Sequence, residues 1–453
     1  MSEEAASILP QEVFAGTRYA VLGLARSGLA TVRALCAAGA SVIAWDRSDA
    51  ARDMAKAALA GSDCFVMEEL TRQSVAGCKG IVVSPGVPIN RHPIADVARA
   101  ANVPLIGDIE LFALARKALP PHRVVGITGT NGKSTTTALI HHLLESAGHI
   151  ARLGGNIGIP ILGTEPLPAG GTYVLELSSY QIDLTRSLEC DVAILLNLSP
   201  DHLDRYDEGF AGYAASKARL FEMQHGHGLA IVDRHSLHEI RPVARALDGR
   251  APVLIEDVTV PGNQADWPAL QGPHNMGNAA AAVAAARKLG LTDAEIEAGL
   301  KSFPGLPHRM ERVAVIGGVL FVNDSKATNP ASTAPALAAF APEEGRARIH
   351  WIVGGLPKGD TLGEIEPYLG NVAAAYTIGE SGEMFASLLE GRVSQITRSE
   401  LMAEAVRAAA AIARPGDVVL LSPACASFDQ FRDYEKRGEA FVSMVHSLGG
   451  DAQ

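Results

Sequence analysis

A glycine-rich turn between a buried strand and a helix carries the residues best suited to bind a nucleotide. RVVGIT (123–128) is followed by GTNGK (129–133) and then by STTTALIHHLLESAG (134–148). This order presents backbone N–H groups and a helix N-terminus to an anion, while Lys133 adds a positive charge and Ser134 a hydroxyl for Mg²⁺. Because position 127 is isoleucine, the match to GxxxxGK[ST] is near but not strict. We predict an ATP site here; an ordinary glycine-rich turn is the alternative.

Two further segments place groups that suit a metal near this turn. TYVLE (172–176) ends a predicted strand at Glu176, and a carboxylate at the carboxyl end of a strand beside a phosphate loop suits Mg²⁺. In VAILLNLSPDHLDRY (192–206) a buried strand leads into a polar loop, where His202 could face a second cation or the substrate. The alternatives are a carboxylate that caps a neighbouring helix and a loop in which Ser199 caps a short helix.

An inward-facing lysine marks the predicted helix GFAGYAASKARLFEM (209–223). Lys217 lies in the centre of an apolar stripe that consists of Phe210, Tyr213, Ala214, Leu220 and Phe221. A buried ammonium is costly unless it is paired or chemically changed. We interpret Lys217 as an active-site lysine, which could carry CO₂ as a carbamate and so become an anionic metal ligand. A stem that snorkels to the surface is the alternative.

Buried Val-, Ile- and Leu-rich runs alternate with Ala-rich helical stretches, which predicts α/β domains built on parallel sheets. RYAVLGL, SGLATVRALCAAG and SVIAWDRS form a Rossmann-like start that ends near Asp46. The pattern restarts after Pro120 and Pro121, and again at the hairpin RVAVIGGVLFVND with its Gly317-Gly318 turn. The 453 residues allow roughly three domains of ~150 residues each. We place these domains at 1–113, 114–306 and 307–453.

Composition excludes several classes of protein. Lys and Arg total 39 against 50 Asp and Glu, and a net charge of −11 argues against a broad basic face for nucleic acid. Charge or proline interrupts every apolar run of about 18 residues, so we expect no membrane span. The acidic N-terminus lacks a signal core, so we expect a cytoplasmic protein. The unpatterned cysteines predict reduced thiols, mostly in the core: Cys36, Cys64, Cys78, Cys190 and Cys425.

A series of motifs resembles, in order, those of the Mur ligases, a family of ATP-dependent amide ligases. The motifs are GTNGKSTTT, LELSSYQ, DHLDRY, GPHNMGNAAAA, PHRME, NDSKATNP, GGLPKGD and SPACASFDQF. With the Rossmann-like start they span residues 20–438, and LELSSYQ and SPACASFDQF are most similar to the member that adds D-glutamate. The resemblance implies an N-terminal domain for a UDP-substrate, a central ATP-binding domain, and a C-terminal Rossmann-like domain for the amino acid.

The resemblance also implies an activity. D-Glutamate would be added to UDP-N-acetylmuramoyl-L-alanine through an acyl phosphate, with release of ADP and phosphate, in peptidoglycan precursor synthesis. ATP, two Mg²⁺ ions and a carbamate on Lys217 would assist the reaction. We expect a monomer with no nucleic-acid partner and no membrane span. No side-chain nucleophile is needed, which agrees with the lack of a GxSxG motif.

Individual residues take roles by the same resemblance. The catalytic residues would be Lys133, His202 and Lys217. The metal ligands would be Ser134, Glu176, His202 and Lys217. ATP would contact Gly129, Thr130, Asn131, Gly132, Lys133, Ser134, Thr135, Asn275, Asn278, Arg309, Asp324 and Lys326. The UDP-substrate would contact Arg26, Ser27, Asp46, Arg47, Ser84, Asn156 and His202. The amino acid would contact Thr328, Lys358, Ser427, Phe428 and Tyr434.

The first glycine loop departs from the family pattern GxGxTG. It reads GLARSG (23–28), so Ala25 replaces the middle glycine and Arg26 could offer a diphosphate an extra positive charge. A nicotinamide-dependent oxidoreductase would also fit this start and Asp46, but Ala25 breaks its fingerprint and GTNGKS has no role in it. A nucleotide-switched binding protein would leave Lys217 unexplained. Other amide ligases of the family, including folylpolyglutamate synthase, remain alternatives.

Overall fold

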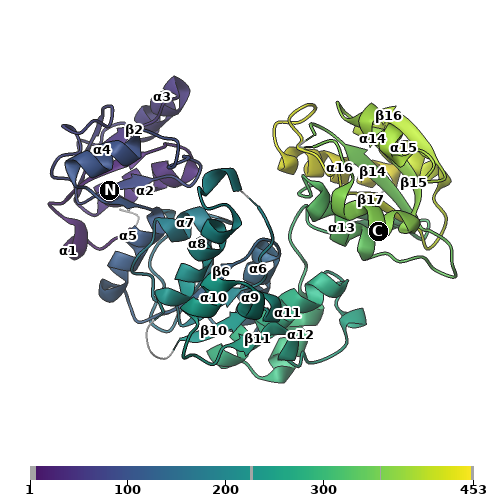
Figure 1. The fold of residues 1–453 in the computed structure, drawn as a ribbon, viewed down its shortest axis with the longest axis horizontal. Helices are drawn as coiled ribbons and strands as arrows, with labels where there is room; N and C mark the ends of the chain where they lie inside the picture. Colours follow the sequence, from purple (N-terminus) through teal and green to yellow (C-terminus); the bar gives the residue numbers. More distant parts are fainter. Residues whose placement is uncertain (1–6, 202, 225–227, 358, 450–453) are drawn as a thin grey trace. The chain divides into compact units, whose positions relative to one another are not determined.

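The structure is a computed structural model that describes residues 7–201, 203–224, 228–357 and 359–449. The chain forms two compact units, Met1–Pro261 with Gly277–Gly299, and Gly262–Met276 with Leu300–Gln453. Three sheets with flanking helices (Figure 1) confirm the predicted α/β class, whereas the boundaries after residues 113 and 306 remain predictions.

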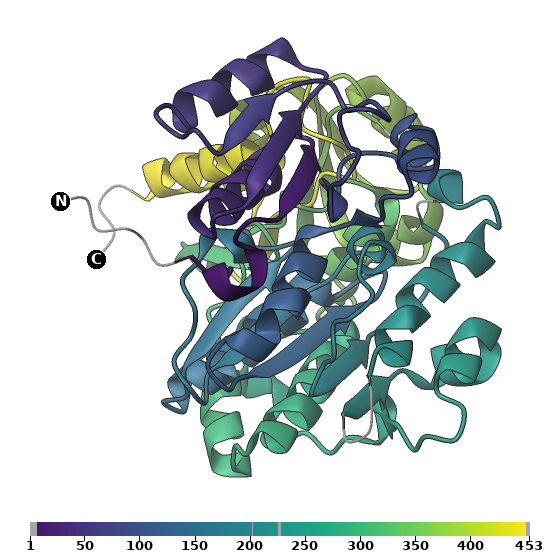
Figure 2. The same cartoon turned by 90° about the vertical axis from the view of Figure 1, so that its left-hand side faces the viewer.

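The N-terminal sheet has five parallel strands in the order β3-β2-β1-β4-β5. Its central strands β1 and β4 are buried apolar runs after the exposed Arg18, as a sheet covered on both faces requires. Figure 2 shows helices on both sides of this sheet. The strands are β1 (Arg18–Leu22), β2 (Ser41–Trp45), β3 (Phe65–Met67), β4 (Gly80–Val83) and β5 (Leu105–Ile106), and the helices are α1 (Gln11–Phe14), α2 (Arg26–Ala37), α3 (Asp49–Ala58), α4 (Ile94–Ala101) and α5 (Asp108–Ala115).

A disulfide joins Cys36 to Cys64, so the prediction of reduced thiols is wrong for this pair. Cys36 stands at the end of α2 and Cys64 just before the edge strand β3, with 5.5 Å between their Cα atoms. That spacing lies in the range that a disulfide needs. The pairing depends on β3 lying next to β2 in the sheet. The spacing of the cysteines in the sequence does not reveal this. Cys78, Cys190 and Cys425 are buried and form no disulfide, as predicted.

The central sheet has six parallel strands in the order β11-β10-β9-β6-β8-β7. β6 lies between β9 and β8, so the loops after these three strands meet at one edge of the sheet. The strands are β6 (Arg123–Thr128), β7 (Ala151–Gly155), β8 (Thr172–Glu176), β9 (Val192–Leu195), β10 (Leu229–Val232) and β11 (Val253–Leu254). The helices are α6 (Lys133–Ser146), α7 (Ser179–Asp183), α8 (Phe210–Glu222), α9 (Arg234–Glu239), α10 (Arg241–Ala246), α11 (Pro273–Leu289) and α12 (Asp293–Ser302).

The C-terminal sheet has the order β12-β13-β17-β14-β15-β16, and only β12 is antiparallel to its neighbour. Gly317 and Gly318, with φ of 59° and 79°, make the predicted two-residue hairpin turn. The strands are β12 (Glu311–Ile316), β13 (Val319–Asn323), β14 (Ile349–Gly354), β15 (Val372–Ile378), β16 (Ile396–Glu400) and β17 (Val418–Leu421). The helices are α13 (Pro330–Ala338), α14 (Gly382–Leu389), α15 (Met402–Ile412) and α16 (Tyr434–Leu448).

Apolar cores cover both faces of the C-terminal sheet. Residues of α13 and α14 pack on one face and residues of α15 and α16 on the other. Within the described ranges, no helix combines the length and the apolarity needed to cross a bilayer.

Candidate active site

The phosphate loop (residues 129–132) joins β6 to α6 and leads directly into the N-terminus of that helix. Gly129 and Gly132 have φ of 148° and 83°, a region that favours glycine. A Cβ on Gly132 would lie 2.2 Å from Asn278 Oδ1, so the close approach of α11 also requires glycine here. Gly132 is the N-cap of α6 and makes no side-chain cap. The predicted strand, turn and helix are thus confirmed, with an anion-binding geometry.

The loop after β9 fixes the phosphate loop from the side. Asn131 N–H donates to Asn197 Oδ1 at 2.9 Å, and Asn197 Nδ2 donates to Asn131 O at 3.1 Å. Ser199 N–H donates to Thr130 Oγ1 at 3.0 Å, so Ser199 also stabilises the phosphate loop. Lys133 Nζ donates to Gly129 O at 2.9 Å and to Thr130 O at 2.8 Å. The Lys133 ammonium therefore already lies against the loop that would hold phosphates.

Glu176 ends β8 beside this loop, as the sequence predicts. It pairs in register with Ile127 of β6, and its side chain is 3% exposed. Asn156 Nδ2 donates to Glu176 Oε1 at 3.0 Å, whereas Glu176 Oε2 is buried and has no hydrogen-bond partner in the described part of the chain. A buried carboxylate oxygen without a donor is costly. A cation at this position would satisfy it.

Lys217 of α8 is only 2% exposed, which confirms that it points inward. Its Nζ donates to Thr128 Oγ1 at 3.1 Å and lies 4.9 Å from the centre of the Tyr213 ring. Burial, followed by the nearby charge of Lys133, holds the pKa of Lys217 well below its usual value. The amine is thus shifted toward its neutral, nucleophilic form.

The donors near the phosphate loop fit Mg²⁺ better than a softer metal. The described residues contain no group of three or more His, Cys, Asp or Glu that could hold an ion. They offer the carboxylate of Glu176 and the hydroxyl of Ser134, which is buried in the first turn of α6. Mg²⁺ keeps several waters and binds through one or two protein oxygens together with phosphates. His202, predicted as a second ligand, lies outside the described residues.

Two asparagines stand at the start of α11. Asn278 is 6% exposed, and its Oδ1 accepts from Thr136 Oγ1 of α6 at 3.3 Å. Asn275, one turn earlier, donates to Gln271 O at 3.0 Å and belongs to the second compact unit. Both lie in the first turns of the predicted helix, and their contact with adenine remains a prediction.

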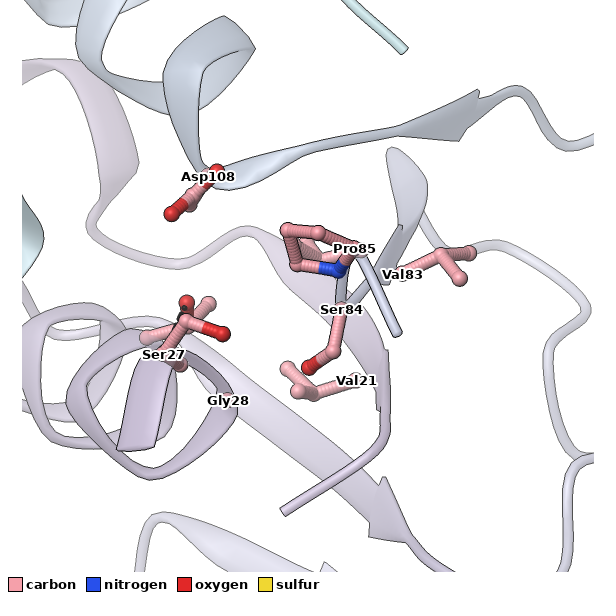
Figure 3. Close-up of a pocket in the computed structure, with 9 residues that line it drawn as sticks. Val21, Ser27, Gly28, Val83, Ser84, Pro85 and Asp108 are labelled. Carbon is pink, nitrogen blue, oxygen red and sulfur yellow. Dashed lines mark hydrogen bonds between the residues drawn. The ribbon is translucent and has the colours of Figure 1, made fainter. Parts of the chain in front are cut away.

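The glycine loop (residues 23–28) borders a pocket in the N-terminal sheet (Figure 3). Ser27 and Gly28 at the start of α2 and Ser84 after β4 line it, as does Asp108 at the start of α5. Ser84 Oγ donates to Gly23 O at 2.9 Å. Burial raises the pKa of Asp108 above its usual value. The structure thus brings Ser27 and Ser84 together, and adds an acid that the motifs did not single out.

Asp46 and Arg26, also predicted for the UDP-substrate, make hydrogen bonds at this loop. Asp46 Oδ2 accepts from Leu24 N–H at 2.8 Å, so Asp46 orders the glycine loop itself. The guanidinium of Arg26 donates to Gly158 O at 3.0 Å, which ties the start of α2 to the segment that follows β7 and contains Asn156. Arg47 is exposed after β2.

In the second unit, Asp324 and Lys326 follow β13. Asp324 accepts from Ser422 Oγ at 2.7 Å and from Met310 N–H at 3.2 Å, and burial raises its pKa to about 7. Lys326 Nζ donates to the Tyr434 hydroxyl at 2.8 Å. Arg309 and Thr328 are half-buried in loops beside β12 and β13. The predicted ATP contacts are thus divided between the two units.

Ser427 and Phe428 lie in the loop that follows β17 (residues 422–433). Since β17 is next to β13 in the sheet, this loop is a neighbour of the loop that follows β13. Ser427 is 2% exposed, whereas Phe428 is 69% exposed. Lys358 lies outside the described residues. The remaining predicted amino-acid contacts, Thr328 and Tyr434, belong to the same unit.

Several residues that shape the site were missed by the sequence reasoning. Thr128 accepts a hydrogen bond from Lys217, and Asn197 accepts one from the phosphate loop. Asp108 lines the pocket beside the glycine loop. Asn197 follows a buried strand, so its position at a carboxyl end was the signal that could have found it. Thr128 and Asp108 gave no signal beyond their polarity.

Comparison with known proteins gives three consecutive matches to family models. Residues 17–107 match the Mur ligase MurD-like N-terminal domain, residues 127–246 the Mur ligase middle domain, and residues 308–425 the Mur ligase glutamate ligase domain. A UDP-N-acetylmuramoylalanine–D-glutamate ligase of Novosphingobium aromaticivorans is 61% identical over 449 residues, which cover 98% of each chain. The enzyme of that name from Sphingopyxis alaskensis is 58% identical, over 98% of this chain and all of the relative.

Solved structures share the fold at low identity. The UDP-N-acetylmuramate-alanine ligase of Thermotoga maritima superposes with a TM-score of 0.57 at 17% identity, over 95% of this chain and 99% of that chain. The MurF ligase of the same organism, solved with ADP, also gives 0.57, at 18% identity over 99% of each chain. The family models and the whole-length identity to these relatives show that the chain belongs to the Mur ligase family.

Proposed function

We propose that this chain is an ATP-dependent ligase that joins D-glutamate to UDP-N-acetylmuramoyl-L-alanine. The observation that carries the proposal is the buried, unpartnered Oε2 of Glu176 beside a phosphate loop that holds Lys133. This combination fits a magnesium nucleotide. The substrates are supported by the names of relatives that are 61% and 58% identical over nearly the whole chain.

As a Mur ligase the chain uses ATP and Mg²⁺. Bound Mg²⁺ supplies positive charge that neutralises the phosphate oxygens. Ser134 and Glu176 would hold one ion, and we assign a second to His202 and Lys217. Lys133 would turn from the carbonyls of Gly129 and Thr130 to the phosphates. The N–H groups at the start of α6 would bind the phosphates from the other side.

The second ion requires Lys217 to be an anion. Its neutral nitrogen would attack the carbon of CO₂, forming an N–C bond and releasing one proton, which gives a carbamate. The depressed pKa of Lys217 supports this step, because only the unprotonated amine reacts. The Thr128 hydroxyl and the Tyr213 ring fix the end of the side chain.

The reaction would proceed in two steps. The carboxylate of UDP-N-acetylmuramoyl-L-alanine attacks the γ-phosphorus of ATP, and ADP leaves. The amine of D-glutamate then attacks the acyl carbon, loses a proton, and expels inorganic phosphate. The chain supplies charge and alignment through Lys133 and the phosphate loop, and no covalent bond to a side chain forms.

The other predicted residues would bind the ends of the substrates. Ser27 and Ser84, with Arg26 and Arg47, would contact the diphosphate of the UDP group. Asp46 and Asn156 would contact uridine and the muramoyl-alanine. Thr328, Ser427, Phe428, Tyr434 and Lys358 would surround the amino acid. Asn275, Asn278, Arg309, Asp324 and Lys326, with Thr135, would complete the ATP site. We propose a monomer that acts in the cytoplasm, in peptidoglycan precursor synthesis.

An amino-acid panel tests the proposal. The protein is given ATP, Mg²⁺ and UDP-N-acetylmuramoyl-L-alanine with D-glutamate, L-glutamate, D-aspartate, L-alanine or meso-diaminopimelate, and phosphate release is measured. Phosphate should appear only with D-glutamate and only with the UDP-substrate. Release with dihydropteroate and L-glutamate instead would favour folylpolyglutamate synthesis, and release without any amino acid would contradict ligation.

A further inference from the structure

A short loop that the motifs do not cover contacts the segment that carries Ser427. The loop of residues 379–381 joins β15 to α14, and β15 is next to β14, which is next to β17. These strands are parallel, so the loops that follow them lie at one edge of the sheet. None of the substrate contacts predicted above belongs to the 379–381 loop.

Ser381 links the loops that follow β14 and β17. Its side chain is buried, and its Oγ accepts from Gly355 N–H at 3.1 Å. The same oxygen lies 3.3 Å from Cys425 Sγ, two residues before Ser427. Ser381 N–H also donates to Gly355 O at 3.0 Å. The serine therefore holds Gly355 and Cys425 at a fixed separation.

A second anchor lies on the other side of Ser427. Asp429 Oδ2 accepts from Glu380 N–H at 3.1 Å, so the residue just before Ser381 holds the residue two positions after Ser427. The fit is tight, because a Cβ on Gly379 would lie 2.1 Å from Asp429 Oδ2. A Cβ on Gly355 would lie 2.4 Å from Ala426 O. Ser427 thus sits between two anchors that both come from the 379–381 loop.

We propose that Ser381 and Asp429 are positioning residues for the amino-acid substrate, because they fix the segment 425–429 that presents Ser427; this inference rests on the proposed function. Neither side chain needs to touch the substrate. Arg437 also holds the carbonyls of Cys425 and Ala426, so removing either anchor loosens the segment around Ser427 without releasing it, and the amino-acid subsite becomes less well preformed. Binding of the amino acid must then order the segment again, which weakens the affinity for the amino acid.

Four variants test this inference. Ser381→Ala removes one anchor and Asp429→Ala removes the other, whereas Asp429→Asn keeps an oxygen that can accept from Glu380 N–H. Ser387→Ala is the matched control, since Ser387 is exposed on α14 and donates only within its helix, to Glu383 O, in the contacts described. Thermal unfolding of each variant checks that the fold is retained.

The KM values for D-glutamate and for ATP are the first readout. We expect Ser381→Ala and Asp429→Ala to raise the KM for D-glutamate about tenfold, the effect of losing roughly one hydrogen bond, with the KM for ATP unchanged. Asp429→Asn and Ser387→Ala should stay within about twofold of the wild type. Equal rises in both KM values, or an unchanged KM for D-glutamate, would overturn the inference.

Hydrogen exchange without substrates is the second readout. The amide of Ala426 donates to Leu356 O, and the amide of Phe431 donates to Ser427 O. Both amides should exchange faster in Ser381→Ala and Asp429→Ala, and at the wild-type rate in Asp429→Asn. Unchanged exchange in the two alanine variants would refute the anchors. A wild type that shows no D-glutamate-dependent ligation would refute the proposed function, whereas a ligating wild type with insensitive variants would refute this inference alone.

Discussion

Replacing Thr128 by valine tests how Lys217 is held. Thr128 is fully buried at the end of β6, where its Oγ1 accepts from Lys217 Nζ at 3.1 Å and donates to Leu177 O at 2.8 Å. Valine has nearly the same shape but no hydroxyl, so both hydrogen bonds are lost. The matched control is Thr128→Ser, which keeps the hydroxyl and removes only a methyl group.

The magnitude follows from these contacts. Removing this hydrogen-bond partner from the Lys217 amine and from the Leu177 carbonyl costs about 1–3 kcal/mol for each group, with the lost hydrogen bonds included. The extra methyl of valine returns about 0.8 kcal/mol. We therefore expect Thr128→Val to destabilise the central sheet by about 1–5 kcal/mol and Thr128→Ser by about 1 kcal/mol. Ligation should fall at least about tenfold in Thr128→Val, because Lys217 loses its fixed position.

Urea titration measures the stability. Since the chain has several domains, we would follow the central sheet through hydrogen exchange of peptides from β6 and α8, because a single global transition is not expected. Phosphate release measures ligation on the same samples. If Thr128→Val were as stable and as active as Thr128→Ser, the hydroxyl would not hold Lys217 and the account of this lysine would be wrong.

Three further predictions concern the central and the N-terminal domains. Lys133→Ala should abolish ATP turnover while the circular dichroism spectrum stays that of the wild type, because the hydrogen bonds from its ammonium to Gly129 and Thr130 stay within its own loop; residual turnover above about 1% would contradict its role. Lys217→Ala should remove ligation, and added acetate should restore part of it, whereas wild-type rates would make the lysine structural. Reducing the Cys36–Cys64 disulfide, which spans 28 residues of sequence, should destabilise the N-terminal sheet by roughly 3–4 kcal/mol in a denaturant titration. A Cys36→Ser/Cys64→Ser variant should not respond to reductant.

Local patterns predicted the parts of the site that depend on neighbours in sequence. The buried strand before Gly129 and the helix after Lys133 fixed the phosphate loop, and periodicity alone showed that Lys217 points inward. Glu176 was placed correctly because it ends a strand that the sheet puts beside β6. In each case the chemistry and the element that carries it lie within a few residues of each other.

Contacts between distant segments were not predictable in this way. Thr128 meets Lys217 across 89 residues, and Asn131 meets Asn197 across 66. The disulfide was missed for the same reason, since it depends on β3 pairing with β2. No periodicity in one sequence reports which polar residue will face another across a sheet edge.

Isotope tracing tests the central claim, that ATP activates the substrate carboxylate as an acyl phosphate. UDP-N-acetylmuramoyl-L-alanine labelled with ¹⁸O in its carboxylate is incubated with the protein, ATP, Mg²⁺ and D-glutamate, and the inorganic phosphate is analysed by mass spectrometry. We predict that each amide formed transfers one ¹⁸O atom to the released phosphate. Amide product accompanied by unlabelled phosphate would contradict the claim.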